Sequence, residues 1–129
     1  MAEHASKVSR RLSQGIAPEV IEHIYAPRLG TEFAAAFPLL GALNEAHLVM
    51  LAKQGILSPA TAKALAAGLL RMDREGHAVI TPDPNLEDAY FNVEARLIAL
   101  TGADVGGRLQ NARSRHNLPA ALDRLRVRE

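Results

Sequence analysis

The fold is decided by residues 37–57, which read FPLLGALNEAHLVMLAKQGIL. The apolar side chains of this stretch recur every three or four positions, the period of one helix face; they are Leu40, Leu43, Ala46, Met50 and Leu51, with His47 among them. Gly55 is a natural stop after the last turn. The pattern predicts a long helix from about residue 28 to residue 54. Pro38 removes one backbone hydrogen bond and should kink or split this helix near Phe37.

The chain before this helix is polar at first and then helical. Pro18 can open a short helix that runs to about Ile24, and Ala26-Pro27 should break it. Residues 1–16 show no clear period, so we expect a flexible arm that needs a partner surface to order it.

The next helix is predicted over residues 59–75. Ser58 precedes a proline and can accept a hydrogen bond as the N-cap, and Gly76 ends the helix. One face of this helix is apolar; it carries Ala62, Leu65, Ala66, Leu69 and Met72. A loop rich in glycine, proline and asparagine follows over residues 76–85.

A further helix should begin at Asn85, which can act as its cap, and end at Gly102. Glu87 and Asp88 fall in its first turn, where the helix dipole favours acids. Its apolar stripe is formed by Leu86, Tyr90, Val93, Leu97 and Leu100. A second loop is expected over residues 101–117.

The last helix begins near Asn117 or Leu118 and reaches Glu129 without a stop signal. We therefore expect residues 118–129 to be the start of a longer helix. The only β-leaning run covers residues 78–81 and is flanked by Gly and Pro. The sequence thus predicts an all-α fold.

Composition narrows the class of protein. The chain has 129 residues, enough for one small domain, and no cysteine, which excludes disulfides and thiolate metal sites. Its net charge of +1 gives no global attraction to nucleic acid or membranes. We find neither a signal peptide nor an apolar run of membrane-spanning length, so a soluble cytoplasmic protein is the expectation.

One loop is crowded with hydrogen-bond donors. Residues 106–117 read GGRLQNARSRHN and lead into the start of the last helix. Backbone amides at a helix start favour an anion, and an arginine can hold a carboxylate through two parallel hydrogen bonds. A purely structural loop, a nucleic-acid contact and a small-molecule carboxylate site are all compatible with this pattern.

This loop resembles the Leu-His-Thr-Gly-Arg-Ser-Arg-Asn-Asp signature of argininosuccinate lyases, members of the fumarase/aspartase superfamily. The matching positions are Gly106, Gly107, Leu109, Arg113, Ser114 and Arg115. Further segments resemble the family in the same order, so that the likeness covers roughly residues 10–129. They are Arg28-Leu29, Ala46-His47, Met50-Leu51, Gly55-Ile56-Leu57 and Glu87-Asp88 followed by Glu94.

The resemblance implies an N-terminal helical domain of that superfamily, with the arm at 1–16, the domain at 17–117 and the start of a central-bundle helix at 118–129. It implies β-elimination of argininosuccinate, or of a related aspartate adduct, to fumarate and an amine, without metal or organic cofactor. It also implies a homotetramer whose sites combine segments of three subunits. Two of those segments, including the one with the catalytic Ser, are missing here. The chain alone should therefore contain no catalytic residue and be inactive.

By the same resemblance, the substrate-binding residues lie in the loop. They are Gln110, Asn111, Arg113, Ser114, Arg115 and His116, with Tyr90 and Asn117 as additional candidates. Arg115 should bind a substrate carboxylate, and Arg113 should hold the loop or a second carboxylate. The family's His and Thr are Gln110 and Asn111 here, its Asn-Asp pair is residues 116–117, and its His after Glu-Asp is Tyr90, which leaves the identity of the substrate open.

Single residues carry narrower expectations. Tyr90 should pack with its hydroxyl toward the 106–117 loop, while Glu87 and Asp88 should be helix-start charges or arginine partners rather than a catalytic pair. A lone histidine on an apolar helix face is usually a satisfied core or interface residue, and we expect this of His47. The remaining histidines outside the loop share no ligand spacing, so no metal site is predicted.

A second function stays open from the residues alone. Six arginines and one aspartate lie between Arg108 and Arg128. The alternative is a non-catalytic helical binding or oligomerisation module, whose arginine-rich C-terminal region binds anions. Salt-dependent DNA binding would favour this alternative, although aromatic stacking residues are missing near the basic region.

Overall fold

The computed structural model describes residues 15–128, and within that range every regular element is helical. In chain order the elements are α1 (Pro18–Val20), the π-helical turn η1 (Ile21–Tyr25), α2 (Ala26–Lys53), α3 (Pro59–Glu75), the 3-10 turns η2 (His77–Val79) and η3 (Pro84–Leu86), α4 (Ala89–Thr101), α5 (Ala103–Gly106), the 3-10 turn η4 (Gly107–Gln110) and α6 (Asn117–Arg128). The predicted all-α fold is confirmed. The predicted arm over residues 1–16 lies, except for its last two residues, outside the described part.

The helix that begins at Pro18 continues into α2, so the predicted break at Ala26-Pro27 is wrong. The backbone N–H of Ala26 donates to the carbonyl of Ile21, five residues earlier, which is the hydrogen bond of a π-helix. Pro27 then occupies the first turn of α2, where a proline needs no N–H partner. The wide π-helical turn accommodates the proline that would otherwise end the helix.

Pro38 lies inside α2, which continues across it as one helix, so of the two predicted outcomes the split near Phe37 is wrong. The lost backbone bond costs roughly 3 kcal/mol. Phe33, Phe37 and Leu40 are buried on both sides of the proline, and each contributes about 1.5–3 kcal/mol. Packing therefore outweighs the local penalty.

The end of α2 follows its prediction. Gly55 takes a left-handed conformation with φ of +66°, and the N–H of Ile56 donates to the carbonyl of Leu51 at 3.0 Å. A second bond runs from the N–H of Gly55 to the carbonyl of Ala52 at 3.1 Å. The pair forms a Schellman motif, which satisfies two of the free carbonyl groups at the helix end.

The joined helix Pro18–Lys53 is long and apolar enough to cross a membrane by length and composition alone. This finding runs against the expectation that the chain has no apolar run of membrane-spanning length. Core helices of soluble proteins and signal sequences pass the same test. In this fold the helix places a stripe of buried residues against α3, α4 and α6.

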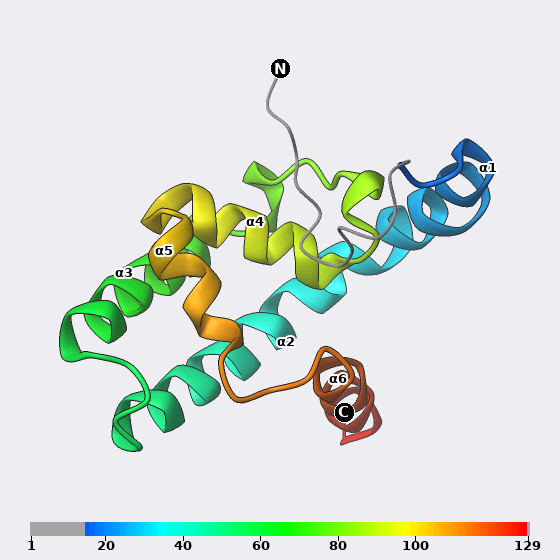
Figure 1. The fold of residues 1–129 in the computed structure, drawn as a ribbon. Helices are drawn as coiled ribbons and strands as arrows, with labels where there is room; N and C mark the ends of the chain where they lie inside the picture. Colours follow the sequence, from blue (N-terminus) through cyan, green and yellow to red (C-terminus); the bar gives the residue numbers. More distant parts are fainter. Residues whose placement is uncertain (1–14, 129) are drawn as a thin grey trace.

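α2 crosses the middle of the molecule, with α4 on one side and α6 on the other (Figure 1). α3 packs against both α2 and α4. Four leucines at the centre are almost completely buried, at 0–1% exposure; they are Leu40, Leu51, Leu65 and Leu97. Ser58 caps α3 as predicted, because its Oγ accepts a hydrogen bond from the N–H of Thr61 at 3.2 Å.

The start of α4 differs from the prediction. Asn85 lies in η3 rather than capping a helix, and Asp88 is the N-cap of α4, accepting a hydrogen bond from the N–H of Phe91 at 3.0 Å. Asp83 plays the corresponding part for η3 by accepting from the N–H of Asn85. Asp88 directly precedes the first residue of α4, so its carboxylate can accept from the N–H groups of the first turn, whereas Asn85 lies four residues before that start.

The predicted loop over residues 101–117 is mostly helical. α5 and η4 fill residues 103–110, which leaves only residues 111–116 irregular. Gly106 has an ordinary helical conformation, but a Cβ added to it would lie 2.7 Å from the Cα of Ile98. This glycine therefore permits close packing of α5 on α4 and does not open a flexible loop.

Candidate functional site

The segment 111–116 links η4 to α6, and its two arginines, Arg113 and Arg115, reach toward α2 and the start of α4. The structure brings Arg113 and Arg115 to two different sides of this segment. It also brings Tyr90, Glu87 and Asp88 from the start of α4 to the same segment, although they are about twenty to thirty residues away in sequence.

Arg113 is held by neutral groups in a partly buried position. Its Nη2 donates to Oδ1 of Asn44 on α2 at 2.7 Å, and its Nε donates to Oε1 of Gln110 at 2.9 Å. The same Gln110 oxygen accepts the hydroxyl of Tyr90 at 2.5 Å, and the Arg113 guanidinium carbon lies 5.5 Å from the centre of the Tyr90 ring. The prediction that the Tyr90 hydroxyl faces this loop is confirmed. Arg113 holds the loop to α2 and α4.

Tyr90 is a hydrogen-bond donor in this network. Burial raises the pKa of Tyr90 to about 12, the charge of Glu94 adds to the rise, and Arg113 opposes it. The phenol therefore keeps its proton throughout the physiological range.

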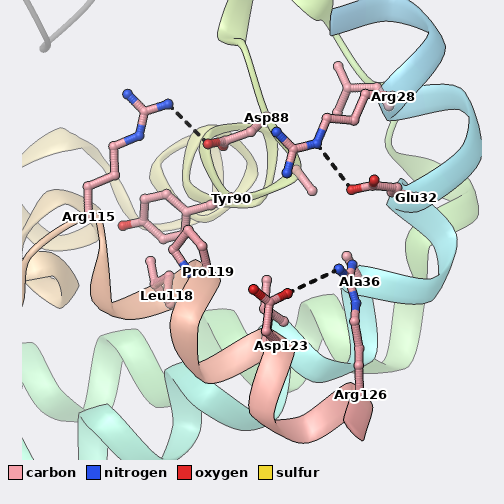
Figure 2. A pocket seen from close by; sticks show the side chains of 13 residues that line it. Arg28, Glu32, Ala36, Asp88, Tyr90, Arg115, Leu118, Pro119, Asp123 and Arg126 are labelled. Carbon is pink, nitrogen blue, oxygen red and sulfur yellow. Dashed lines mark hydrogen bonds and ion pairs between the residues drawn. The ribbon is translucent and has the colours of Figure 1, made fainter. Parts of the chain in front are cut away.

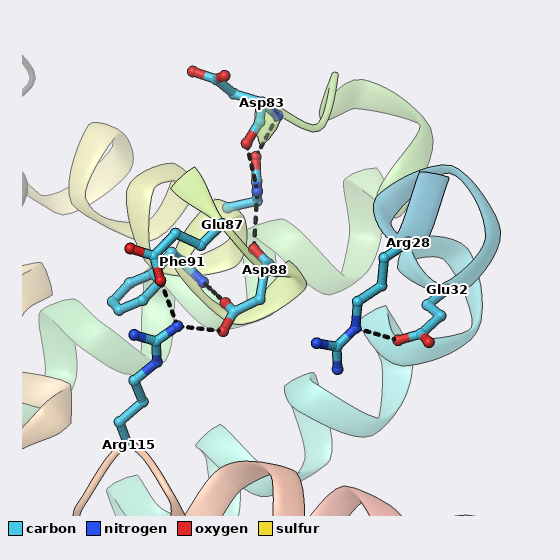
Figure 3. A network of polar contacts seen from close by, with 8 residues as sticks. Arg28, Glu32, Asp83, Glu87, Asp88, Phe91 and Arg115 are labelled. Atoms are coloured by element: carbon cyan, nitrogen blue, oxygen red, sulfur yellow. Dashed lines mark hydrogen bonds and ion pairs between the residues drawn. The ribbon is translucent and has the colours of Figure 1, made fainter. Parts of the chain in front are cut away.

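Arg115 meets two carboxylates. Its Nη2 donates to Oε2 of Glu87 at 2.7 Å and to Oδ2 of Asp88 at 3.1 Å (Figure 3). The guanidinium carbon lies 4.5 Å from the centre of the Phe91 ring, a cation–π distance. Burial lowers the pKa of Arg115, but the two acids outweigh burial and raise it above its usual value. Glu87 and Asp88 are arginine partners, as predicted.

Glu87 has a strained backbone. Its φ is +69° and its ψ is −65°, and the N–H of Asp88 donates to the carbonyl of Leu86 at 2.8 Å across it. These values define a γ-turn of the rare form, in which a residue with a Cβ is disfavoured. Such strain persists only where surrounding contacts impose it.

Those contacts come from Asn92, a buried side chain of α4 that is 3% exposed. Its Oδ1 accepts the N–H of Asp83 at 2.6 Å. Its Nδ2 donates to the carbonyls of Asp83 and Asp88 at 3.1 and 2.9 Å. Asn92 therefore holds both ends of residues 83–88, the segment that contains the γ-turn and the two acids facing Arg115.

The other predicted site residues contact mainly the backbone of the segment. Asn117 Oδ1 accepts the N–H of Ser114 at 2.7 Å, and Ser114 Oγ accepts the N–H of His116 at 3.3 Å. The side chains of Ser114 and His116 face the exterior, since both residues are exposed. The hydrogen bonds among Ser114, His116 and Asn117 therefore shape the turn that leads into α6.

Asn111 is contacted by His47 at its backbone carbonyl. His47 Nε2 lies 2.8 Å from the Asn111 carbonyl, so this nitrogen carries the proton and donates. Burial lowers the pKa of His47, the hydrogen bond to Asn111 raises it, and Arg113 lowers it, with a net decrease. His47 is a satisfied histidine, as predicted.

A cavity of about 110 Å³ opens beside Arg115, between α2, the start of α4 and α6 (Figure 2). Its charged lining consists of three arginines, each paired with an acid: Arg28 with Glu32, Arg115 with Asp88, and Arg126 with Asp123. Its volume corresponds to a few water molecules, enough for one carboxylate-bearing end of a ligand.

Sequence analysis missed Asn44 and Asn92. Both are buried amides, at 2% and 3% exposure, and asparagine is rarely found inside a protein unless it is hydrogen-bonded. Their positions on the apolar faces of two predicted helices were the signal that could have identified them.

Comparison with known proteins shows which proteins this chain resembles. None of the known protein-family models matches the chain. It is 34% identical over 119 residues to argininosuccinate lyase 1 of Shouchella clausii, which covers 92% of this chain and 24% of that protein. It is 42% identical over 88 residues to the argininosuccinate lyase of Methanosarcina acetivorans, covering 68% of this chain and 18% of that protein. The argininosuccinate lyase of Methanospirillum hungatei is 43% identical over 87 residues, 67% of this chain and 18% of its own length. The chain spans about a fifth of the length of these relatives, and the resemblance to argininosuccinate lyases is confirmed.

Proposed function

We propose that this chain, which is argininosuccinate lyase-like over most of its length, supplies the first substrate-binding segment of a carbon–nitrogen lyase. The proposed reaction is β-elimination of argininosuccinate, or of a related aspartate adduct, to fumarate and an amine such as arginine. One observation carries the proposal. Arg115 is fixed through Nη2 alone at the edge of a cavity, so its Nη1 and Nε groups are directed away from the two acids.

Arg115 is the proposed carboxylate-binding residue. A guanidinium presents its N–H groups in a planar fork that matches two carboxylate oxygens. Glu87 and Asp88 hold one corner of that fork, and the substrate carboxylate approaches the remaining groups. Ser114, His116, Asn111 and Asn117 line the same segment and contribute neutral hydrogen-bonding groups to the substrate.

Gln110, Arg113 and Tyr90 have a supporting role in the proposal. Their hydrogen bonds to one another hold the segment in place. The resemblance assigns Gln110 to substrate and leaves Arg113 to hold the loop or a second carboxylate, and the contacts of both residues here favour a loop-holding function.

The proposed chemistry needs groups beyond this segment. A base removes the proton next to a substrate carboxylate, and the charge that develops on that carboxylate is stabilised by fixed donors such as Arg115. The electron pair then forms the C=C bond of fumarate as the C–N bond breaks, and the leaving nitrogen takes up a proton. The Thr-His and Gly-Ser-Ser segments that resemblance associates with this step do not occur in the 129 residues.

We therefore propose that the site is completed by other segments in a cytoplasmic homo-oligomer, with residues 17–117 as the domain and 118–129 joining the bundle. The 129 residues alone release no fumarate. No metal or organic cofactor enters the proposed reaction, and neither nucleic acid nor membrane is a proposed partner.

The test is a segment exchange. Residues 10–129 replace the matching segment of the Shouchella clausii lyase, and fumarate release is followed by ultraviolet absorbance with argininosuccinate and other N-substituted aspartates. The exchanged enzyme should release fumarate from at least one of them, and the 129-residue chain from none. An exchanged enzyme that assembles normally but acts on no adduct would contradict the proposal. Sustained release by the chain alone would refute the claim that the site is incomplete.

A further inference from the structure

We propose that two buried asparagines, Asn44 and Asn92, are positioning residues that each fix one arginine of the Arg113–Arg115 pair. Asn44 acts directly on Arg113. Asn92 acts on Arg115 through the turn that carries Glu87 and Asp88. The inference rests on the proposed function only for what the arginines do, since the positioning itself concerns the chain as it stands.

Asn44 is the anchor of Arg113 on α2. Its side chain is 2% exposed, and its Oδ1 accepts a 2.7 Å hydrogen bond from Nη2 of an arginine 69 residues away. The arginine's Nε then donates to Gln110. With two nitrogen atoms of the planar guanidinium bound, Arg113 cannot rotate, and the loop that it belongs to is tied to the long helix.

Asn92 holds the segment whose acids bind Arg115. It uses both halves of its amide, accepting from the Asp83 N–H and donating to the Asp83 and Asp88 carbonyls. These three bonds close the segment 83–88 around the γ-turn at Glu87. The two acids are therefore presented together to Nη2 of Arg115.

The two asparagines differ in what they need. Asn44 binds Arg113 through its Oδ1 acceptor. An aspartate offers the same acceptor and can even strengthen the bond to the guanidinium. Asn92 needs its Nδ2 donor, and an aspartate there would face two carbonyl oxygens without a proton to give. The same Asn→Asp substitution should therefore have opposite outcomes at the two positions, which a purely space-filling role does not predict.

The experiment is hydrogen exchange by NMR on the full 129-residue chain. Asn44→Leu keeps the shape and removes the acceptor, and should speed exchange of the Ser114 amide and the Arg113 Nε–H roughly tenfold, with the Asp83 and Asp88 amides unchanged. Asn44→Asp should exchange like the unaltered chain. Asn92→Leu and Asn92→Asp should both speed the Asp83 and Asp88 amides.

Three results would overturn the inference: equal acceleration in both segments, no change in Asn44→Leu, or Asn44→Asp behaving like Asn44→Leu. Should Asn44→Leu not fold, Arg113→Met removes the same bond from its half-buried end. Arg113→Met should speed exchange of the Ser114 amide as Asn44→Leu would, and an unchanged Ser114 amide in Arg113→Met contradicts direct action on Arg113. Because no substrate is involved, these results are independent of the fumarate assay that tests the proposed function.

Discussion

Arg113 and Arg115 stand two residues apart in one segment, yet their surroundings are opposite in kind. Arg113 is bound by neutral oxygens of Asn44 and Gln110 and packs near Tyr90. Arg115 is bound by the carboxylates of Glu87 and Asp88 at the edge of a cavity, and 39% of its side chain is exposed. The first surroundings satisfy a charge in a partly buried place, and the second pair a charge with two acids at a cavity where we propose that an anion binds.

The difference teaches how a lyase-like segment divides its work. A partly buried guanidinium with two neutral acceptors stabilises the loop, because removing it would take the partner from Oδ1 of Asn44 and one of two donors from Oε1 of Gln110. An ion pair whose arginine side chain is 39% exposed contributes less to stability, typically below about 1 kcal/mol, since water and salt screen it. Arg115 can therefore exchange part of its contacts for a ligand at little cost to the fold.

The largest effect should appear in activity. In the exchanged lyase, Arg115→Met should lower kcat/KM about a hundredfold, because a fixed donor to the developing charge is lost. Arg115→Lys should recover only part of it, since an ammonium cannot bind in a fork. Arg108→Met is the matched control, as Arg108 donates to the Asp104 carbonyl away from the cavity. An undiminished kcat/KM in Arg115→Met would remove Arg115 from substrate binding.

The next effect concerns the packing of α5, which precedes the segment that carries both arginines. Gly106→Ala should destabilise the chain by about 1–3 kcal/mol, because the added Cβ meets the backbone of Ile98. Gly41→Ala is the control within α2, where nothing lies within 4 Å, and should stabilise by about 0.5–1 kcal/mol. Urea unfolding compares the two. Equal signs for the two substitutions would mean that α5 is not packed as described.

A smaller effect separates the two acids that face Arg115. Asp88→Ala should cost about 1–2 kcal/mol, because it removes the cap of α4 together with an ion pair. Glu87→Gly should be close to neutral, since the glycine relieves the positive φ while the lost ion pair is partly exposed. Thermal unfolding at neutral pH measures both, and a larger loss for Glu87→Gly would show that the turn is not strained.

The smallest effect is a loss of folding stability at alkaline pH that involves Tyr90, the neighbour of Arg113. Burial raises the pKa of Tyr90 to about 12, above the ordinary tyrosine value of about 10. The unfolded chain therefore loses this proton first, and the contribution of Tyr90 to stability is full below pH 10 and falls as the pH rises toward 12. Tyr90→Phe should flatten this decline in urea unfolding, and Tyr25→Phe should leave it intact. An unchanged slope in Tyr90→Phe would place the Tyr90 phenol in water.

Local signals predicted much of this fold. The cap at Ser58, the stop at Gly55 and the helix period all depend on a few neighbouring residues, and the structure follows them. The sequence also predicted that the Tyr90 hydroxyl faces the 106–117 loop and that Glu87 and Asp88 are helix-start charges or arginine partners, and the structure agrees.

Apart from the cap of α4, the failures involve contacts that neighbouring residues cannot reveal. The helix continues through Pro27 and Pro38 because of a π-helical turn and buried packing. Gly106 looked like a loop glycine, although its role is close contact with α4. The bond between Asn44 and Arg113 joins positions 69 residues apart, so no local pattern contains it.

The most direct test of this division of work is urea unfolding of Arg113→Met and Arg115→Met, measured side by side on the 129-residue chain. We expect Arg113→Met to lose about 2–3 kcal/mol of unfolding free energy, because the buried Oδ1 of Asn44 loses its partner and Oε1 of Gln110 keeps only the Tyr90 hydroxyl. Arg115→Met should lose less than about 1 kcal/mol. A loss in Arg115→Met that equals or exceeds the loss in Arg113→Met would contradict the account.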